Sequence, residues 1–423
     1  MTVNLKEKTL GILSSWTENC GNASYTQQLI EELAPHFKKV ECIHLDQDLI
    51  HSGVSVDASI IEQVKKYDFI NLQYEAGLYG KTTKKAHRLI QKIINNHDHV
   101  TVAVHSIFIN NTINPKARFA ELKFNILRKL NKIGLLKSSI SSSEYSYLRF
   151  LFFVSKAVKS GKKIQFIVHR KELVRYMANF GIPTIHHPIV SATNRDIAEL
   201  NGPLERDIFI KKYNLDASKT YLGIFGFLAG YKGFDVALDA LSLLPANYEL
   251  VICGQRHPAS NKAIMRNRRD KKAAPTPIPA REFSSDTQTQ LLNWIVTEKK
   301  LLNRIHYINH LVDEEDFKQV VAAVDVPIFP YYEVGQGGSG PISYATHLNY
   351  GARIIASRTK AFEEYSRDYY PKCITFFDQG NHLELSQKIQ TAPSLRENIL
   401  KAQKNFGVDT NIATYLKATI NSA

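Results

Sequence analysis

The chain has 423 residues, of which 44% are hydrophobic and 22% are charged. That balance is typical of a globular protein with a sizeable core, and the length predicts two domains. This composition excludes collagen-like, coiled-coil and wholly disordered proteins. No apolar run of about 18 residues occurs, so no helix is expected to span a membrane. Residues 1–8 lack the apolar stretch of a signal peptide, and the four cysteines lie far apart in sequence, which favours a reducing cytoplasm.

The net charge of +14 comes from two basic segments. Residues 115–163 carry twelve lysines and arginines against two acids, and residues 256–281 carry eight against one. In the first segment, apolar residues recur at helical spacing between the cations. Such a helix either lies on an anionic membrane or packs in a core with a solvated basic face, and both alternatives stay open. The second segment is predicted to be a long exposed loop. Nucleic acid is not an expected partner, because no recognisable binding motif accompanies the charge.

Short β-branched runs alternate with helical patterns in the first half of the chain. Strands are predicted at residues 10–14, 40–45, 69–73, 100–105 and 165–169, with helices between them at 25–33, 58–66 and 84–95. Strands that alternate with helices indicate a parallel sheet built from βαβ units.

The same pattern restarts after a polar stretch that has little periodicity. Further strands are predicted at residues 221–226, 248–253, 304–307, 326–330 and 353–357, and a last helix at 394–419. The fold class is therefore α/β with two Rossmann-like domains. We expect residues 1–200 to form the first, with a basic insertion at about 113–163, and residues 201–423 the second, with a basic loop at about 256–281.

Ligands of open α/β sheets bind beyond the carboxyl ends of the strands, so the loops at those ends hold the candidate site residues. In the first half these are the start of a helix after the first strand, polar side chains at the end of the third, and a histidine after the fourth: Gly21, Asn22, Gln73, Glu75 and His105. Backbone N–H groups at the helix start and these side chains could bind a phosphate or sugar hydroxyls. A tight turn and a satisfied structural histidine are the plain alternatives.

In the second half, Gly226 and Lys232 follow a predicted strand and precede a helix. The glycine permits close approach of a ligand, and the lysine supplies a cation that suits a diphosphate. Arg256 follows the next strand end. The plain alternative for Lys232 is a lysine on a solvated first turn, although a cation there opposes the helix dipole.

A further strand runs into Glu333 and then into a glycine-rich loop before a helix. Successive backbone N–H groups of such a loop can cradle phosphate oxygens without a metal. Its candidate residues are Gly337, Gly338, Ser339 and Gly340. Glu333 could accept hydrogen bonds from ribose or sugar hydroxyls, and a flexible turn with a surface acid is the alternative.

In this order, the motifs resemble a glycosyltransferase of the two-Rossmann type, GT-B, most like the retaining enzymes of glycosyltransferase family 4. The matching segments are residues 20–25, 73–78, 105, 231–235, 330–340 and 351–357. The resemblance covers nearly the whole chain apart from the two basic segments. It implies two facing Rossmann-like domains with a cleft between them and a C-terminal helix that crosses back to the first domain.

The resemblance also implies where the substrates bind. In the family, a nucleotide-diphospho-sugar binds mainly in the C-terminal domain and the acceptor mainly in the N-terminal one, without a metal or other cofactor. Lys232 would hold the diphosphate together with backbone N–H groups at residues 338–340. Glu333 would be the nearest match to the first acid of the family's glutamate pair. His105 would lie beside the transferred sugar and the acceptor, which completes the expected catalytic set.

Two features of the family pattern are missing. The arginine that often precedes the lysine is absent from residues 226–228, and Arg256 is the candidate to replace it. The place of the second glutamate falls near Thr346. These departures leave open a catalytically silent protein of the same fold that binds a partner or a glycan. A nucleotide-sugar epimerase or hydrolase is the other alternative, with Glu75 as the main acid near the sugar.

The expected activity is that of a metal-independent, hexosyltransferase-like enzyme. It would move a sugar from a nucleotide-diphospho-sugar to an acceptor hydroxyl with retention, in glycan or cell-envelope polysaccharide synthesis. The departing phosphate could itself act as the base, so no pair of catalytic carboxylates is expected. The acceptor would be a glycan, a lipid-linked sugar or a protein, and the segment 115–163 would favour a place at the inner face of the membrane.

Overall fold

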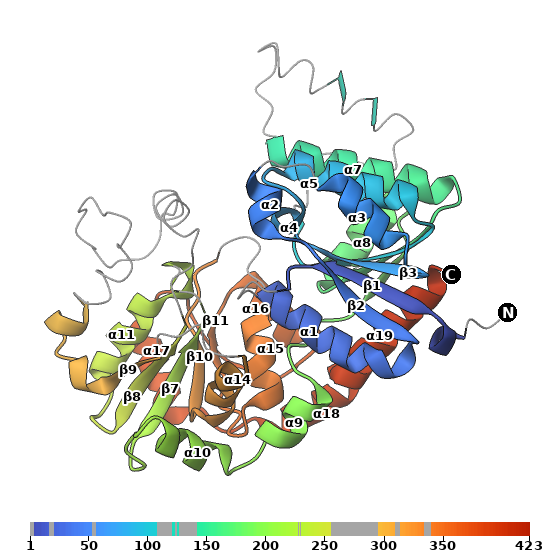
Figure 1. Cartoon of the computed structure of the whole chain (residues 1–423). Coiled ribbons are helices and arrows are strands. Elements are labelled where there is room, and N and C mark those ends of the chain that lie inside the picture. Colours follow the sequence, from blue (N-terminus) through green and yellow to red (C-terminus); the bar gives the residue numbers. More distant parts are fainter. Residues whose placement is uncertain are drawn as a thin grey trace. The chain divides into compact units, whose positions relative to one another are not determined.

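The computed structural model describes residues 4–16, 21–52, 56–107, 121–122, 125–126, 142–226, 228, 230–254, 295–308, 314–333 and 340–423. The chain forms two compact units. Unit 1 comprises Met1–Pro188 together with Asp409–Ala423, and unit 2 comprises Ile189–Val408. Each unit contains one six-stranded sheet in which every pairing is parallel, so the predicted α/β class with two Rossmann-like halves is confirmed (Figure 1).

The sheet of unit 1 has the order β2-β1-β3-β4-β5-β6. Its strands are β1 (Thr9–Ser14), β2 (Lys39–His44), β3 (Phe69–Tyr74), β4 (His99–Val104), β5 (Lys163–Val168) and β6 (Thr184–His186). The predicted strands coincide with the first five of them, because strands buried on both faces read as continuous apolar runs. The order reverses between β1 and β3, which makes the carboxyl ends of these two strands the topological switch point.

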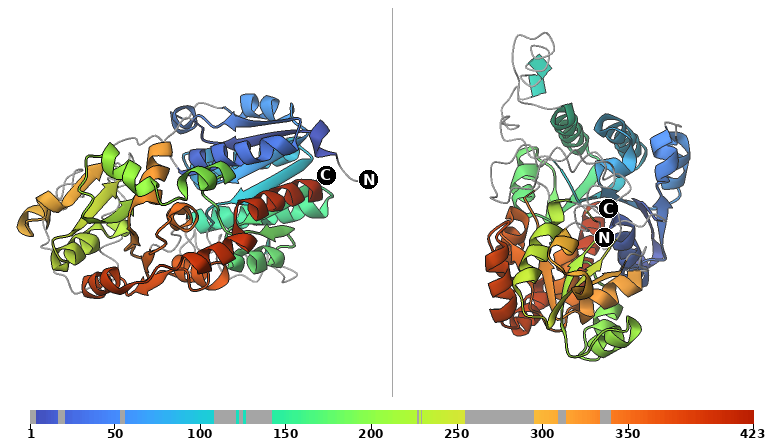
Figure 2. Two further views of the ribbon diagram at one scale, coloured as in Figure 1. Left: turned by 90° about the horizontal axis from the view of Figure 1, so that it is seen from below. Right: turned by 90° about the vertical axis from the view of Figure 1, so that its left-hand side faces the viewer.

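Helices cover both faces of this sheet. They are α1 (Gly21–Leu33), α2 (Gln47–Ser52), α3 (Asp57–Val64), α4 (Ala76–Tyr79), α5 (Thr83–Asn96), α7 (Ser142–Lys159) and α8 (Lys171–Asn179), and α19 (Val408–Asn421) joins them from the C-terminal end of the chain. Helices α3, α5, α7 and α8 share one continuous apolar core with the sheet. Helices α1 and α19 lie on the opposite face (Figures 1 and 2).

The sheet of unit 2 has the order β12-β11-β10-β7-β8-β9. Its strands are β7 (Thr220–Phe225), β8 (Tyr248–Cys253), β9 (Ile305–Ile308), β10 (Val326–Phe329), β11 (Ile355–Ser357) and β12 (Thr375–Phe377). The switch point of this sheet lies between β7 and β10. Apart from the last strand, these elements match the predicted ones.

Two apolar clusters cover the two faces of this second sheet. One contains α11 (Phe234–Leu243) and α17 (His382–Thr391). The other contains α10 (Glu205–Lys212), α14 (Glu314–Ala323), α15 (Gly340–Leu348), α16 (Lys360–Asp368) and α18 (Arg396–Phe406). Helix α9 (Asn194–Leu200) packs against α14 and α15.

The division between the units falls after Pro188 instead of near residue 201. The polar stretch that was predicted to end the first domain belongs to unit 2 because its polar groups find partners there. The backbone N–H of Ser191 donates to the hydroxyl of Ser343 at 3.0 Å. Asp196 forms a buried ion pair with Lys318 at 2.8 Å. Paired buried charges fix the position of the segment that carries them.

The single helix predicted at 394–419 is two helices, α18 and α19, with Gly407 between them. A Cβ atom at Gly407 would lie 2.5 Å from the backbone oxygen of Gln403, so the close approach at this turn requires a glycine. The last helix contributes to unit 1, as the resemblance implied. Its Tyr415 hydroxyl lies 3.1 Å from the Tyr25 hydroxyl on α1.

The apolar residues of the stretch 147–159 form part of the core of unit 1. Tyr147, Leu148, Phe150, Leu151 and Val154 of α7 are all buried in it. This stretch therefore packs against its own domain, and its apolar face is not open to a membrane. Most of residues 113–141 and the whole basic loop 256–281 lie outside the described residues. None of the described helices is long and apolar enough to cross a membrane.

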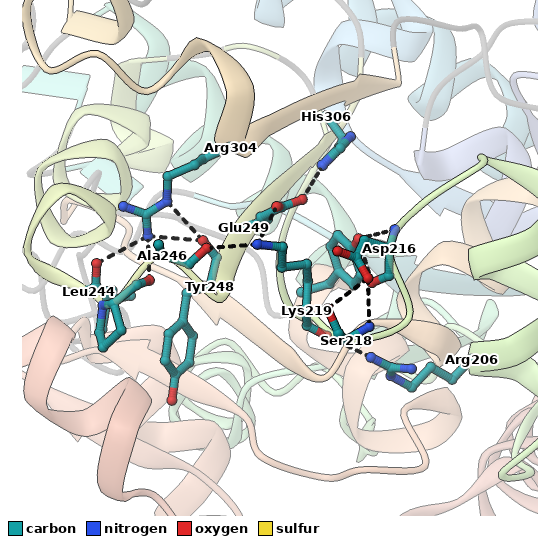
Figure 3. Close-up of polar contacts among 12 residues, drawn as sticks. Arg206, Asp216, Ser218, Lys219, Leu244, Ala246, Tyr248, Glu249, Arg304 and His306 are labelled. Atoms are coloured by element: carbon teal, nitrogen blue, oxygen red, sulfur yellow. Dashed lines mark hydrogen bonds and ion pairs between the residues drawn. The ribbon is translucent and has the colours of Figure 1, made fainter.

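Polar contacts tie together the amino ends of β8 and β9 of unit 2 (Figure 3). The guanidinium group of Arg304, just before β9, donates to the backbone oxygens of Tyr248 at 2.9 Å, Pro245 at 2.9 Å and Leu244 at 3.2 Å. Nearby, the Glu249 carboxylate lies 2.6 Å from Nε2 of His306. This end of the sheet is opposite to the carboxyl ends of the strands, and its contacts hold the starts of β8 and β9 together.

Replacing Arg304 with lysine is expected to lower the free energy of unfolding by about 1–3 kcal/mol. Lysine keeps the charge but lacks the planar fork that reaches several carbonyl oxygens at once. The matched control is Arg367→Lys, because Arg367 is exposed and pairs with the adjacent Asp368. Urea unfolding of both variants checks the expectation, and equal small effects would contradict it.

Candidate functional site

Two candidate residues of unit 2, Gly226 and Lys232, lie close together at the switch point of its sheet. Lys232 ends the short turn Gly230–Lys232 that follows β7, and Tyr331 lies in the loop that follows β10. The ammonium group of Lys232 donates a hydrogen bond to the hydroxyl of Tyr331 at 2.5 Å. Both side chains are almost fully buried, with 3% and 4% of their surface exposed. Lys232 therefore does not lie on a solvated first turn, and its burial needs another explanation.

The Lys232 cation has aromatic and hydroxyl neighbours but no ion pair among the described residues. Its Nζ atom lies 4.5 Å from the ring centre of Tyr331 and 5.5 Å from that of Tyr231. Burial lowers the pKa of Lys232 from 10.5 to about 7. A buried ammonium group is costly unless an anion or hydrogen-bond acceptors accompany it. The arrangement thus provides a place for an anionic ligand.

Glycines bring the backbone close to this cation. Gly226, directly after β7, has φ +90°, and a Cβ atom there would lie 2.9 Å from Nζ of Lys232. Gly254, directly after β8, lies so close to Gly226 that a Cβ atom would be 2.0 Å from its backbone oxygen. Gly233 has φ +69° and begins the turn into α11. These three positions require glycine for backbone reasons, and together they let the backbone pack closely around the cation.

Glu333 lies two residues after Tyr331 and has a local structural contact. One carboxylate oxygen accepts a hydrogen bond from the backbone N–H of Lys360 at 2.7 Å, at the start of α16. The backbone N–H of Glu333 donates to Oε1 of Gln379 at 2.8 Å. A negatively charged side chain at a helix N-terminus stabilises the helix even when no ligand is bound. The structure therefore gives Glu333 a helix-capping contact that the sequence did not predict, in addition to any role toward a ligand.

The glycine-rich loop leads into α15, which begins at Gly340. Pro341 lies in the first turn of this helix, where its missing N–H group has no partner to lose. Gly337, Gly338 and Ser339 lie outside the described residues, and so does Arg256.

The position expected for a second glutamate is a buried threonine. The Thr346 hydroxyl lies 2.8 Å from the hydroxyl of Tyr365 and donates to the backbone oxygen of Ser343 at 3.0 Å. With 1% of its surface exposed, Thr346 is part of the core. Its side chain is engaged inside unit 2 by these contacts.

In unit 1, two candidate residues meet across the switch point of the sheet. Asn22, at the start of α1, donates from its side-chain amide to the carboxylate of Glu75, directly after β3. Gly21 begins α1 and has no neighbouring atom within 4 Å of the place of a Cβ atom. The first turn of α1 is therefore open beside a carboxylate that already has a partner.

The other two candidates of unit 1 are in direct contact. Nε2 of His105, just after β4, lies 2.7 Å from Oε1 of the fully buried Gln73. The imidazole of His105 packs edge-on against the ring of Tyr25, with 5.2 Å between ring centres. A second histidine, His169, directly follows β5, and its ring centre lies 5.1 Å from that of His105. Burial, and secondarily the neighbouring His169, lowers the pKa of His105 well below its usual value.

Two members of this polar cluster were not predicted: His169 and Tyr415. Nδ1 of His169 lies 3.0 Å from the backbone oxygen of His187, and burial lowers the pKa of His169 to about 4. The Tyr415 hydroxyl lies 3.1 Å from that of Tyr25. The only signal for His169 in the sequence was its place at a predicted strand end, while α19 is too distant along the chain to be paired with these strands by pattern.

The titratable and cysteine side chains of the described segments contain no group of three or more that could hold a metal ion. Lys232 is the cation described at the switch point of unit 2, and His105 and His169 form a pair of imidazoles in the cluster of unit 1.

Comparison with models of known protein families finds no match, and neither does comparison with the sequences of characterised proteins. Solved structures do match over almost the whole chain. Sucrose-phosphate synthase from Thermosynechococcus elongatus has a TM-score of 0.59 at 14% identity, covering 97% of this chain and 98% of its own. HepE from Anabaena, in complex with UDP and glucose, has a TM-score of 0.61 at 14% identity, covering 99% and 100%.

A glycosyltransferase from Rickettsia africae is similar to the same extent. Its TM-score is 0.59 at 13% identity, and the match covers 98% of both chains. At such low identities the likeness establishes the fold. The chain has the GT-B fold, as the sequence motifs led us to expect.

Proposed function

We propose that this protein is a glycosyltransferase that moves a hexose from a nucleotide-diphospho-sugar to an acceptor hydroxyl, with retention and without a metal. The observation that carries the proposal is Lys232. It is a buried cation with no described ion pair, at the switch point of unit 2, where Gly226 allows the backbone to approach it closely. A diphosphate would supply the missing negative charge.

The mechanism assigned to unit 2 is stabilisation of the leaving group. As the bond to the sugar breaks, negative charge develops on the diphosphate. Lys232 and backbone N–H groups around the start of α15 would already be oriented toward that charge, an effect that is often worth several kcal/mol. Glu333 would contact donor hydroxyls with the part of its carboxylate that does not cap α16.

Unit 1 is proposed to bind the acceptor through Gly21, Asn22, Gln73, Glu75 and His105. His105 would contact the transferred sugar and the attacking hydroxyl, and the departing phosphate would take the proton. The acceptor class is a glycan, lipid-linked sugar or protein, in glycan or cell-envelope polysaccharide synthesis. The basic residues around 115–163 would then hold the protein near an anionic membrane surface at its cytoplasmic side.

The similar structures indicate which donor to test first. HepE is described in complexes with UDP and with UDP-glucose. A second similar protein is described as a UDP-forming trehalose-phosphate synthase. We therefore place UDP and UDP-glucose first among the ligands for this protein.

The test is calorimetric binding of UDP, GDP, ADP, dTDP and CMP to wild type and to Lys232→Met, with and without Mg²⁺. The proposal expects one diphosphate to bind wild type equally well with and without Mg²⁺, and to bind Lys232→Met at least tenfold more weakly. CMP, a monophosphate, is the internal control. Absence of binding by every diphosphate would contradict the proposal.

Diphosphate binding is also expected to take up a proton. With a pKa of about 7, Lys232 is mostly neutral at pH 8 in the empty protein. A bound anion favours its charged form, so binding at pH 8 takes up a proton and the affinity falls as the pH rises above 7. Calorimetry in two buffers of different ionisation enthalpy measures this uptake. Lys232→Met should show none, and equal uptake in both proteins would contradict the assignment.

One observation favours a second candidate function. The place expected for the second glutamate is the buried Thr346, whose hydroxyl is engaged within unit 2. A protein of this fold that binds a glycan without transferring sugar would not need that acid. Release of UDP from UDP-glucose in the presence of an acceptor distinguishes the two functions, because a silent binding protein would release none.

A further inference from the structure

A chain of buried hydrogen bonds leads from the backbone of β3 to His105. It begins at the backbone oxygen of Ile70, which lies 3.2 Å from Oγ1 of Thr101. Thr101 lies 2.7 Å from Nδ2 of Asn71, and Oδ1 of Asn71 lies 2.6 Å from Nε2 of Gln73. The last link joins Oε1 of Gln73 to Nε2 of His105 at 2.7 Å.

The backbone oxygen of Ile70, at the start of this chain of hydrogen bonds, determines which atom is the donor in each of the bonds. A backbone oxygen can only accept, so the single hydroxyl proton of Thr101 goes to Ile70. The oxygen of Thr101 then accepts from the amide of Asn71, and the amide oxygen of Asn71 accepts from Gln73. In the reverse direction, the oxygens of Thr101 and Ile70 would face each other at 3.2 Å without a proton between them.

The consequence reaches the imidazole of His105. Because Oε1 of Gln73 can only accept, Nε2 of His105 donates and carries the proton. A neutral imidazole has one N–H group, so Nδ1 of His105 is left with a lone pair.

The groups around His105 keep it neutral. His169 lies over it with 5.1 Å between ring centres, and Tyr25 meets it edge-on. Nδ1 of His169 donates to the backbone oxygen of His187, which orients that ring, and burial lowers its pKa to about 4, so it is neutral as well. Burial raises the pKa of Tyr25 to about 12, so it carries no charge. Among the described contacts of His105, none is with a carboxylate that would favour an imidazolium.

We infer that Gln73 is a positioning residue that fixes His105 in one neutral tautomer, protonated on Nε2, so that Nδ1 accepts a hydrogen bond from a ligand hydroxyl. The ligand group at His105 is therefore a hydrogen-bond donor, such as a sugar hydroxyl, and not an oxygen of a phosphate or carboxylate. This ligand role rests on the proposed function, while the tautomer itself does not.

The direct test is the ¹⁵N NMR spectrum of the full chain with labelled histidine, at pH 6 to 8. Protonated and unprotonated ring nitrogens have clearly separate shifts, and His105→Ala identifies the signals. We expect His105 to show one neutral form with the proton on Nε2 throughout this range. A proton on Nδ1, a mixture of tautomers, or titration between pH 6 and 8 would overturn the inference.

The functional test uses Gln73→Glu, which keeps the hydrogen-bond acceptor and adds a negative charge next to His105. The charge raises the pKa of His105, so protonation blocks Nδ1 at low pH. We expect the ratio of kcat/KM at pH 8 to that at pH 6 to rise at least tenfold over wild type. Gln165→Glu is the control, because Gln165 is also buried in this sheet and has no described contact with His105.

The two experiments fail in distinguishable ways. An unchanged pH profile of Gln73→Glu, with the labelled histidine showing the raised pKa, would overturn the ligand role of His105 and leave the tautomer standing. If no sugar transfer occurs at all, the NMR measurement on wild type still decides the tautomer. The same measurement on wild type can refute the inference even if Gln73→Glu does not fold.

Discussion

Replacing Lys232 with alanine is expected to lower kcat/KM by about 100-fold or more, because removal of one group that stabilises leaving-group charge commonly has an effect of this size. The lysine is the described cation at the switch point of unit 2, and it is held there by Tyr331. The assay is release of nucleoside diphosphate from the donor sugar that binds. Activity within about threefold of wild type would refute the assignment.

The matched control for this variant is Lys211→Ala. Lys211 lies on α10 in the same unit and is exposed. Its loss should leave kcat/KM unchanged. The free energy of unfolding of a Lys232 variant is a second control, and the direction in which it changes with pH is informative. The pKa of this lysine is lower in the folded protein than in the unfolded chain, so the unfolded chain binds more protons between pH 7 and 10.

Stability should therefore rise with pH over that window in wild type, and Lys232→Met, of similar shape but uncharged, should lack this rise. At pH 7 and below, where the wild-type protein carries the full cost of the buried charge, the methionine variant should be the more stable of the two. A variant that is inactive but at least as stable as wild type identifies a functional residue rather than a structural one.

Replacing Gly233 with alanine is expected to lower the free energy of unfolding by about 4 kcal/mol or more, in the range of strong backbone clashes. Gly233 has φ +69°, and a Cβ atom would lie 1.9 Å from the backbone oxygen of Pro330. That oxygen belongs to the loop that carries Tyr331, the partner of Lys232. The variant should therefore lose diphosphate binding as well as stability.

Gly181→Ala provides the matched control. Gly181 has the same φ of +69°, but no atom lies within 4 Å of the place of its Cβ. Its substitution should cost only the conformational penalty of about 1–2 kcal/mol. Urea unfolding of the two variants separates the penalty for backbone conformation from the penalty for the clash. Equal losses would show that Pro330 moves aside.

The strands and the switch points could be predicted from the sequence because their signals are local. Buried parallel strands are continuous apolar runs, and the loops after β1, β3, β4, β7 and β10 carry the small, polar and charged residues that ligands need. The contact of Gln73 with His105 follows from neighbouring strand ends in the same way. Six of the predicted site residues therefore fall into three described pairs: Asn22 with Glu75, Gln73 with His105, and Lys232 near Gly226.

Other features depend on contacts that no local pattern records. The partner of Lys232, Tyr331, is 99 residues away along the chain. The capping of α16 by Glu333 requires β10 and β11 to be neighbours in the sheet. The polar stretch before residue 201 was predicted to end the first domain because no nearby residue in the sequence indicates a partner for it. The buried ion pair of its Asp196 is with Lys318, which is distant along the chain.

Unit 1 is discontinuous in sequence, and this has a consequence for how the protein is made. Its sheet is complete by residue 188, but α19, with Asn411 and Tyr415, is synthesised only after the whole of unit 2. The face of the sheet that this helix covers stays open on the ribosome while about 220 further residues emerge. The hydrogen bond between Tyr25 and Tyr415 forms only after that helix has emerged. If unit 2 binds the nucleotide and unit 1 the acceptor, as proposed, donor binding would precede competence for transfer during biosynthesis.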